Sequence, residues 1–177
     1  NVEVLIASGA SDLDLTGSDT RDIIQGNSGS NIINGAGGFD VMVGGVGNDV
    51  YAVDNSLDAV IEAVGEGYDN VYSSIDFIIS EDSEIGRVLL TGKAVVLRGS
   101  STNNQIFGND VVNVLDGRGG IDYLLGFGGG DIFQITAGDD GEDVIGDFSR
   151  TDADRIAFAG FDGANTTVTH EGDGLFT

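Results

Sequence analysis

Large apolar residues recur at intervals of nine in two separate stretches of the chain. They are Ile24, Ile33, Met42 and Tyr51 in the first stretch, and Ile106, Leu115, Leu124 and Phe133 in the second. Such a fixed period is typical of a repeat architecture in which every repeat is one small structural unit. We expect each repeat to be a turn followed by a very short strand, with the large apolar residue pointing inward.

Gly and Asp or Asn follow the same period of nine. Each repeat begins with a glycine, at Gly17, Gly26, Gly35, Gly44, Gly99, Gly108, Gly117 and Gly126. The sixth residue of each repeat is Asp22, Asn31, Asp40, Asp49, Asn104, Asn113, Asp122 or Asp131. The repeat blocks cover 17–52 and 99–134, and GGVGNDVYA (44–52) and GRGGIDYLL (117–125) are among the best copies.

Two repeats of nine make one coil of 18 residues, so that residues 18 apart become vertical neighbours. Successive coils then stack as parallel strands about 4.8 Å apart. This register places Asp22 against Asp40, Asn31 against Asp49, Asn104 against Asp122, and Asn113 against Asp131. Glycine early in each turn permits positive φ and a close approach of the backbone.

Composition narrows the function classes. The 177 residues include 30 acidic and 7 basic ones, a formal net charge of -23, and so acidic a chain repels nucleic acid. No apolar run reaches the ~20 residues of a membrane-spanning helix. The absence of Cys and the single His argue against disulfides and zinc, and 30 Gly argue against long helices. A hydrophobic fraction of 40% allows a buried core.

The stacked acidic turns indicate a divalent cation. Two like charges at 4–5 Å repel by ~1 kcal/mol in water and by more in a drier site. A calcium ion between the turns reverses the sign, because it accepts carboxylate and carbonyl oxygens. Mg²⁺ fits less well, since it demands octahedral geometry and keeps its waters. We therefore expect several calcium ions, with binding and folding coupled in one event.

The repeats resemble the GGxGxDxUx nonapeptides of RTX proteins, the hemolysin-type calcium-binding family, which also occur in serralysin-like proteases and alginate epimerase modules. The resemblance implies an all-β fold, a right-handed parallel β-roll (β-solenoid) with calcium in both rows of turns. It implies ligands from the sixth side chain and from carbonyls of the first four residues. The residues carried over are Gly35, Gly37, Gly38, Asp40, Gly44, Gly45, Gly47, Asp49, Gly117, Gly119, Gly120, Asp122, Gly126, Gly128, Gly129 and Asp131.

Several copies depart from the family pattern. Asn31, Asn104 and Asn113 offer a neutral amide oxygen, so we expect weaker sites there. The copies at 17–25 and 99–107 lack most of the glycines. After each block the Asp register continues for one more repeat, so Asp58 and Asp140 can close sites with Asp40 and Asp122. In the tail, Asp143, Asp147 and Asp154 are either ligands or acidic turns between strands.

The two halves look like an internal duplication. VLIASGASDLDLTG (4–17) resembles RVLLTGKAVVLRG (87–99), and each segment leads into a repeat block. We expect one continuous β-roll made of two modules, 1–86 and 87–177. The segments 57–64 and 69–79 read as short strands that continue the solenoid, whereas 80–86 could form a short helix.

No set of residues stands out as catalytic, so we expect a non-enzymatic, calcium-binding module of a secreted bacterial protein. The resemblance implies export through a type I channel, folding in extracellular calcium and stabilisation of the parent protein. Two alternatives stay open: a module that binds an extracellular polysaccharide, and a calcium-stiffened segment of a surface-layer protein or adhesin. The seventh positions, such as Ile32 and Tyr123, are apolar and should point outward, either because strands favour such residues or because they dock a partner.

Overall fold

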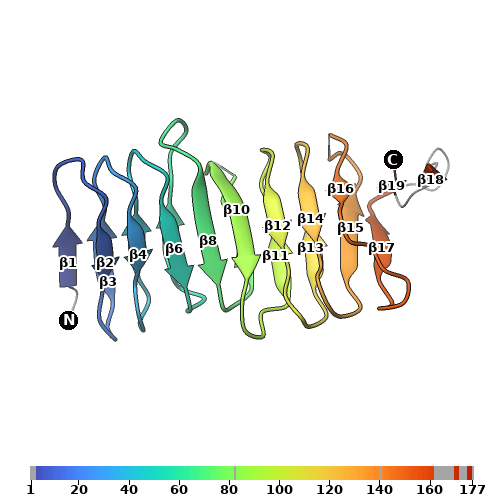
Figure 1. Cartoon of the computed structure of the whole chain (residues 1–177), viewed down its shortest axis with the longest axis horizontal. Coiled ribbons are helices and arrows are strands. Elements are labelled where there is room, and N and C mark those ends of the chain that lie inside the picture. Colours follow the sequence, from blue (N-terminus) through green and yellow to red (C-terminus); the bar gives the residue numbers. More distant parts are fainter. Residues whose placement is uncertain (1–2, 82, 140, 162–169, 172–174, 177) are drawn as a thin grey trace.

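The computed structural model describes residues 3–81, 83–139, 141–161, 170–171 and 175–176. Its strands stand side by side along the long axis of the molecule, in sequence order from the N-terminal to the C-terminal end (Figure 1). The described residues contain no α-helix. Of the segment 80–86, where the sequence allowed a short helix, residues 83–84 lead into strand β10. Within the same residues, nothing has the length and apolarity of a membrane-crossing helix.

Even-numbered strands form one face, a parallel sheet in the order β16-β14-β12-β10-β8-β6-β4-β2. Their bounds are β2 (Asp14–Thr16), β4 (Ile32–Asn34), β6 (Val50–Val53), β8 (Asp69–Ser73), β10 (Ile85–Leu90), β12 (Gln105–Phe107), β14 (Tyr123–Leu125) and β16 (Val144–Ile145).

Odd-numbered strands form the opposite face, in two parallel sheets ordered β1-β3-β5-β7 and β17-β15-β13-β11-β9. Their bounds are β1 (Glu3–Ile6), β3 (Asp22–Gln25), β5 (Val41–Val43), β7 (Ala59–Ile61), β9 (Phe77–Ile78), β11 (Val96–Arg98), β13 (Val114–Asp116), β15 (Ile132–Thr136) and β17 (Arg155–Ala159). Near the C-terminus, β18 (His170–Glu171) and β19 (Leu175–Phe176) pair antiparallel.

Successive strands therefore alternate between two faces, so that one coil consists of two strands and two turns. Within the blocks the pairs are 18 residues apart, as in Ile24 with Met42 and Leu115 with Phe133. This is the parallel β-roll with two nonapeptides per coil that the sequence predicted. The strands predicted within 57–79 also continue the coil, as β7, β8 and β9.

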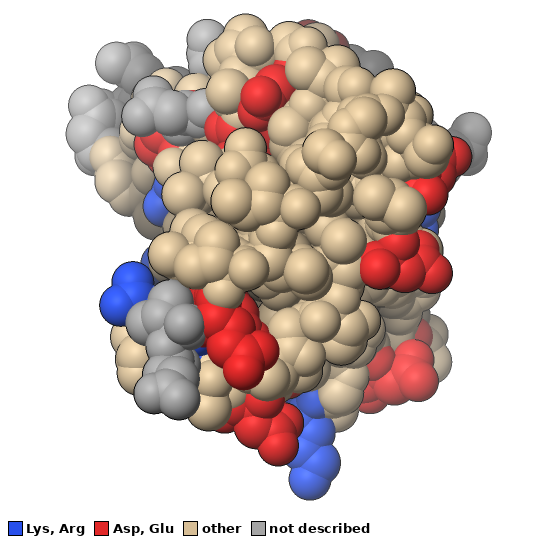
Figure 2. Space-filling model, turned by 90° about the vertical axis from the view of Figure 1, so that its left-hand side faces the viewer, with Lys and Arg blue, Asp and Glu red and all other residues tan. Residues whose placement is uncertain are grey.

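The core is a single column of inward side chains between the two faces. All eight residues at the eighth position are buried, with at most 2% exposure. The seventh position points outward as predicted, and Ile32 and Tyr123 are 51% and 40% exposed. Figure 2 views the N-terminal end, where acidic residues gather toward the margins.

The odd-numbered face is interrupted in the middle of the molecule, because β7 and β9 belong to different sheets. The even-numbered face runs past this point through β8 and β10, with a register shift between Ile85 and Arg87. The expected boundary between 86 and 87 falls inside β10, which pairs with both β8 and β12.

Candidate metal centre

The sixth residues of neighbouring coils meet as the period of 18 predicted. The backbone N–H of Asp22 donates to Oδ1 of Asp40 at 2.7 Å, and that of Asn31 donates to Oδ1 of Asp49 at 2.6 Å. In the second block, Asn104 donates in the same way to Asp122, and Asn113 donates to Asp131. All these side chains are buried, so one carboxylate oxygen of each Asp acceptor holds two coils in register.

The second oxygen of the same carboxylates has no partner. Oδ2 of Asp40, Asp49, Asp122 and Asp131 is buried and accepts no hydrogen bond from the described part of the chain. A buried polar atom without a partner costs roughly 1–3 kcal/mol, and more when it is charged. Four such atoms at equivalent places in the repeat call for a common explanation.

The turns of the repeats fall into two kinds, which we call closed and open. In the closed turns (17–22, 26–31, 99–104 and 108–113), the second residue's N–H donates to the side-chain oxygen of the sixth. The distances are 2.6 Å for Ser18 to Asp22, 2.8 Å for Asn27 to Asn31 and for Ser100 to Asn104, and 2.7 Å for Asn109 to Asn113. In these turns the backbone itself satisfies the inward oxygen.

The open turns (35–40, 44–49, 117–122 and 126–131) leave that oxygen free. Their second residue has a left-handed backbone, with φ of 60° at Ala36, 88° at Gly45, 64° at Arg118 and 65° at Phe127. The N–H of Ala36, Arg118 and Phe127 donates instead to Asn34, Asp116 and Asp147. A left-handed backbone costs a non-glycine residue roughly 1–2 kcal/mol. Three of the four open turns thus accept strain, and all four keep a carboxylate oxygen unpaired, a combination found at functional sites.

The predicted glycine ligands lie in the same open turns. The first glycines, Gly35, Gly44, Gly117 and Gly126, leave room for the carboxylate, since a Cβ on any of them would collide with Oδ2 of its own Asp. The fourth glycines, Gly38, Gly47, Gly120 and Gly129, all have positive φ. Gly37, Gly119 and Gly128 complete these turns at the third position.

Oxygens from adjacent coils also converge at the first position. A Cβ placed on Gly17 would lie 2.5 Å from Oδ2 of Asp22 and 2.6 Å from the carbonyl oxygen of Gly35 in the next coil. Hence carboxylate and carbonyl oxygens approach the same space, and these are the ligand types that calcium prefers. The donor set contains neither thiol nor imidazole, so it fits a hard cation.

Burial raises the pKa of the carboxyl groups in all four open turns. The pKa of Asp122 rises to about 7 and that of Asp131 to about 6, because desolvation outweighs the backbone hydrogen bond that each accepts. The pKa values of Asp40 and Asp49 shift in the same direction for the same reason. Neighbouring carboxylates raise all four further. A divalent cation in the turns would offset both the desolvation of these carboxylates and the repulsion between them.

The closing residues of the two blocks differ. Asp58 takes its predicted place, since its Oδ1 accepts the N–H of Asp40 at 2.9 Å, while its Oδ2 accepts the N–H of Asn55. Asp140 lies outside the described residues. The N–H of Asp122 donates to Asp143, 21 residues further on, because the last coil is longer than 18 residues. In the tail, Asp154 accepts the N–H of Asp131, and Asp147 accepts that of Gly126.

Counting by 18 missed two buried carboxylates. Asp69 accepts the N–H of Asp49 at 2.7 Å although it lies 20 residues away, and its Oδ2 is also unpaired. Glu62 is 5% exposed and likewise has an unpaired oxygen, Oε2. The segment GEGYD (65–69) carries the end of the GGxGxD pattern and could have revealed Asp69, but two inserted residues displace it from the period.

Comparison with protein families agrees with this geometry. The family model of the RTX calcium-binding nonapeptide repeat matches residues 16–51 and 96–124, in 4 copies. Searches of curated proteins and of solved structures found no match. The matched segments contain the closed and open turns of the first block and the beginning of the second. The chain therefore contains RTX nonapeptide repeats in these two segments, and repeats of this family bind calcium ions.

Proposed function

We propose that this β-roll is a non-catalytic module of a secreted bacterial protein, which folds when it meets extracellular calcium and then stabilises the parent protein. The unpaired, buried oxygens of Asp40, Asp49, Asp122 and Asp131 carry this proposal. The calcium ligands we infer are the residues of the open turns, with weaker contributions from the closed turns and from Asp58 and Asp143. We also infer that the two duplicated halves share one roll.

Charge links calcium to folding and to location. Without a counterion, a net charge of -23 and rows of buried carboxylates oppose the compact state. Extracellular calcium modules work at ~10⁻⁴–10⁻³ M, far above cytosolic levels. A chain of this kind stays extended inside the cell, suits passage through a narrow type I channel, and folds outside. RTX repeats are typical of secreted bacterial proteins, which agrees with this location.

Circular dichroism with chelator and with millimolar calcium tests the proposal. We expect a disordered spectrum at neutral pH in chelator and a β spectrum once calcium is added, with magnesium a poor substitute. The same β spectrum under both conditions would contradict calcium-induced folding. Secretion is tested separately, by following export of the parent protein from cells with and without a type I channel.

Polysaccharide binding is a second candidate, because the odd-numbered face carries a polar groove of about 470 Å³. Its lining includes Arg98, Arg118 and Gln134, beside the buried Asp116. Arg98 pairs with Asp116 and Arg118 pairs with Glu81, and Asp139 adds another carboxylate, so a neutral glycan is the ligand to test. Glycan arrays in calcium, with Arg98→Ala against the distant Lys93→Ala, separate this role from a purely structural one. Calcium-dependent self-assembly would indicate the surface-layer or adhesin role instead.

A further inference from the structure

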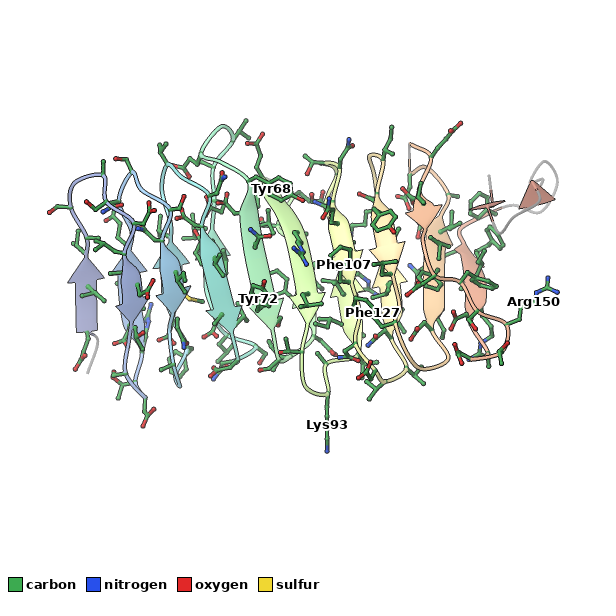
Figure 3. All side chains as sticks on the ribbon, viewed as in Figure 1. Tyr68, Tyr72, Lys93, Phe107, Phe127 and Arg150 are labelled. Carbon is green, nitrogen blue, oxygen red and sulfur yellow. The ribbon has the colours of Figure 1, made fainter. Side chains whose placement is uncertain are left out.

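The turn that enters β8 differs from every nonapeptide turn. Val43 pairs with Ile61, so the next residue, Glu62, occupies the place that Gly44 has one coil earlier. The turn 62–69 has two more residues than 44–49, and it projects beyond its neighbours in Figure 1. Tyr68, labelled in Figure 3, belongs to this turn, and its N–H donates to Oδ1 of Asn48 in the turn before.

Glu62 turns its side chain into the roll. Its Oε1 accepts a hydrogen bond from the hydroxyl of Tyr51, a fully buried residue at the eighth position of its repeat. A Cβ on Gly44 would collide with both the Tyr51 hydroxyl and Oδ2 of Asp49, so these two oxygens already lie close together. The longer turn gives the glutamate room to reach this point.

Three buried carboxylates meet there. Asp49, Glu62 and Asp69 each offer an oxygen within 4.8 Å of the others. Each also has one buried oxygen without a partner: Oδ2 of Asp49, Oε2 of Glu62 and Oδ2 of Asp69. Oxygens bound to one calcium at 2.3–2.6 Å lie up to ~5 Å apart, so this spacing suits a shared ion.

The charge around the cluster is of one sign. The charged groups that act on Glu62 are Asp69, Asp49 and Glu66, all of them acidic. A single proton shared in a hydrogen bond would join two of these three carboxylates, but the third would still have an unpaired oxygen. A cation satisfies all three oxygens at once.

We propose that Asp49, Glu62 and Asp69 form a three-carboxylate calcium site, which shares Asp49 with the last nonapeptide turn of the first block and is tighter than the sites made by nonapeptides alone. The proposal rests on the calcium-binding function above. A third charged ligand raises calcium affinity over a site with one or two carboxylates, so this site fills first. It lies beside the interruption between β7 and β9, where the odd-numbered face lacks a continuous sheet. The ion thus ties together two coils at the place where the odd-numbered face is interrupted.

Calcium titration of the whole chain by calorimetry tests the site with Glu62→Gln, which keeps the shape and removes the charge. We expect the tightest class of sites to weaken by about tenfold or more, while the weaker sites still bind. Glu66→Gln is the matched control, because it removes the same charge from the same turn and keeps an acceptor for the N–H of Ala63. Because Glu66 acts on the site through its charge and offers it no unpaired buried oxygen, Glu66→Gln should weaken the tightest class much less than Glu62→Gln does.

Terbium luminescence gives a second readout that does not depend on the stability of Glu62→Gln. The first Tb³⁺ ions bound should be sensitised by Tyr51, so Tyr51→Phe lowers the early emission and Tyr123→Phe leaves it unchanged. Equal calcium affinity in Glu62→Gln and Glu66→Gln, with equal early emission in both Tyr variants, would overturn the three-carboxylate site but not the nonapeptide sites. A wild-type chain that bound no calcium would overturn both.

Discussion

For the single residue, the main constraint is that the side chain of the sixth residue and a side chain at the first position cannot occupy the same space. The inward carboxylate oxygen of the sixth residue occupies the volume that a side chain at the first position would need, as at Gly35 and Asp40. The first glycine is therefore required by a close approach and not by its φ. The third glycine has no such neighbour, because a Cβ on Gly37 would find its nearest atom at 3.6 Å.

Gly35→Ala and Gly37→Ala form a matched pair within one open turn. The first substitution should push Asp40 from its position and destabilise the calcium-loaded protein by about 1–3 kcal/mol. The second should change the free energy of unfolding by no more than about 0.5 kcal/mol. Urea unfolding in saturating calcium measures both. Equal effects of the two substitutions would show that the carboxylate does not fill the space above Gly35.

At the scale of the element, each open turn is preceded by a closed turn one coil earlier. Asp22 and Asp40 illustrate this order, since Asp22 is satisfied by Ser18 of its own turn while Oδ2 of Asp40 is free. Closed turns can form without an ion, whereas each open turn buries a carboxylate oxygen that has no hydrogen-bond partner. Folding of the element therefore depends on the ion mainly where the glycine-rich pattern is complete.

Asp40→Ala tests whether ions lie between turns. Asp40 contacts Asp22 on one side and Asp58 on the other through backbone hydrogen bonds, so a bridging geometry predicts the loss of two calcium ions. Asp19→Ala, which removes an exposed charge from the neighbouring turn, should lose none. Calorimetric stoichiometry decides, and an unchanged number of ions in Asp40→Ala would contradict bridging.

The period of nine predicted the coil, the inward residues and the facing pairs because each depends only on regular spacing. It failed where the spacing changes. Asp69 lies 20 residues after Asp49, and Asp143 lies 21 after Asp122, since inserted residues lengthen the turns without altering the strand register. The difference between open and closed turns was also hidden, because it depends on the φ of residues such as Ala36 and Phe127 that carry no glycine signature.

At the scale of the whole molecule, stability depends on how the buried carboxylates are neutralised. Calcium is one route and protons are another. Burial raises the pKa of Glu62 to about 8, of Asp122 to about 7, and of Asp69 and Asp131 to about 6, well above the ordinary values of 4.5 for Glu and 3.8 for Asp. The folded, calcium-free chain thus binds more protons than the unfolded chain between pH ~4 and ~8.

Lowering the pH should therefore partly replace calcium in stabilising the folded chain. Because the folded state holds the extra protons, the free energy of unfolding in chelator rises as the pH falls from 8 toward 4, and β structure should appear in that window. Calcium affinity should depend on pH in the opposite direction, because protons compete with calcium for the same oxygens. The affinity should fall as the pH is lowered from 8 to 5, and calcium binding at pH 7 should release protons. Circular dichroism in chelator and calorimetry in buffers of different ionisation enthalpy measure the two effects. A calcium-free chain that gained no β structure between pH 8 and 4 would contradict the raised pKa values on which this behaviour depends.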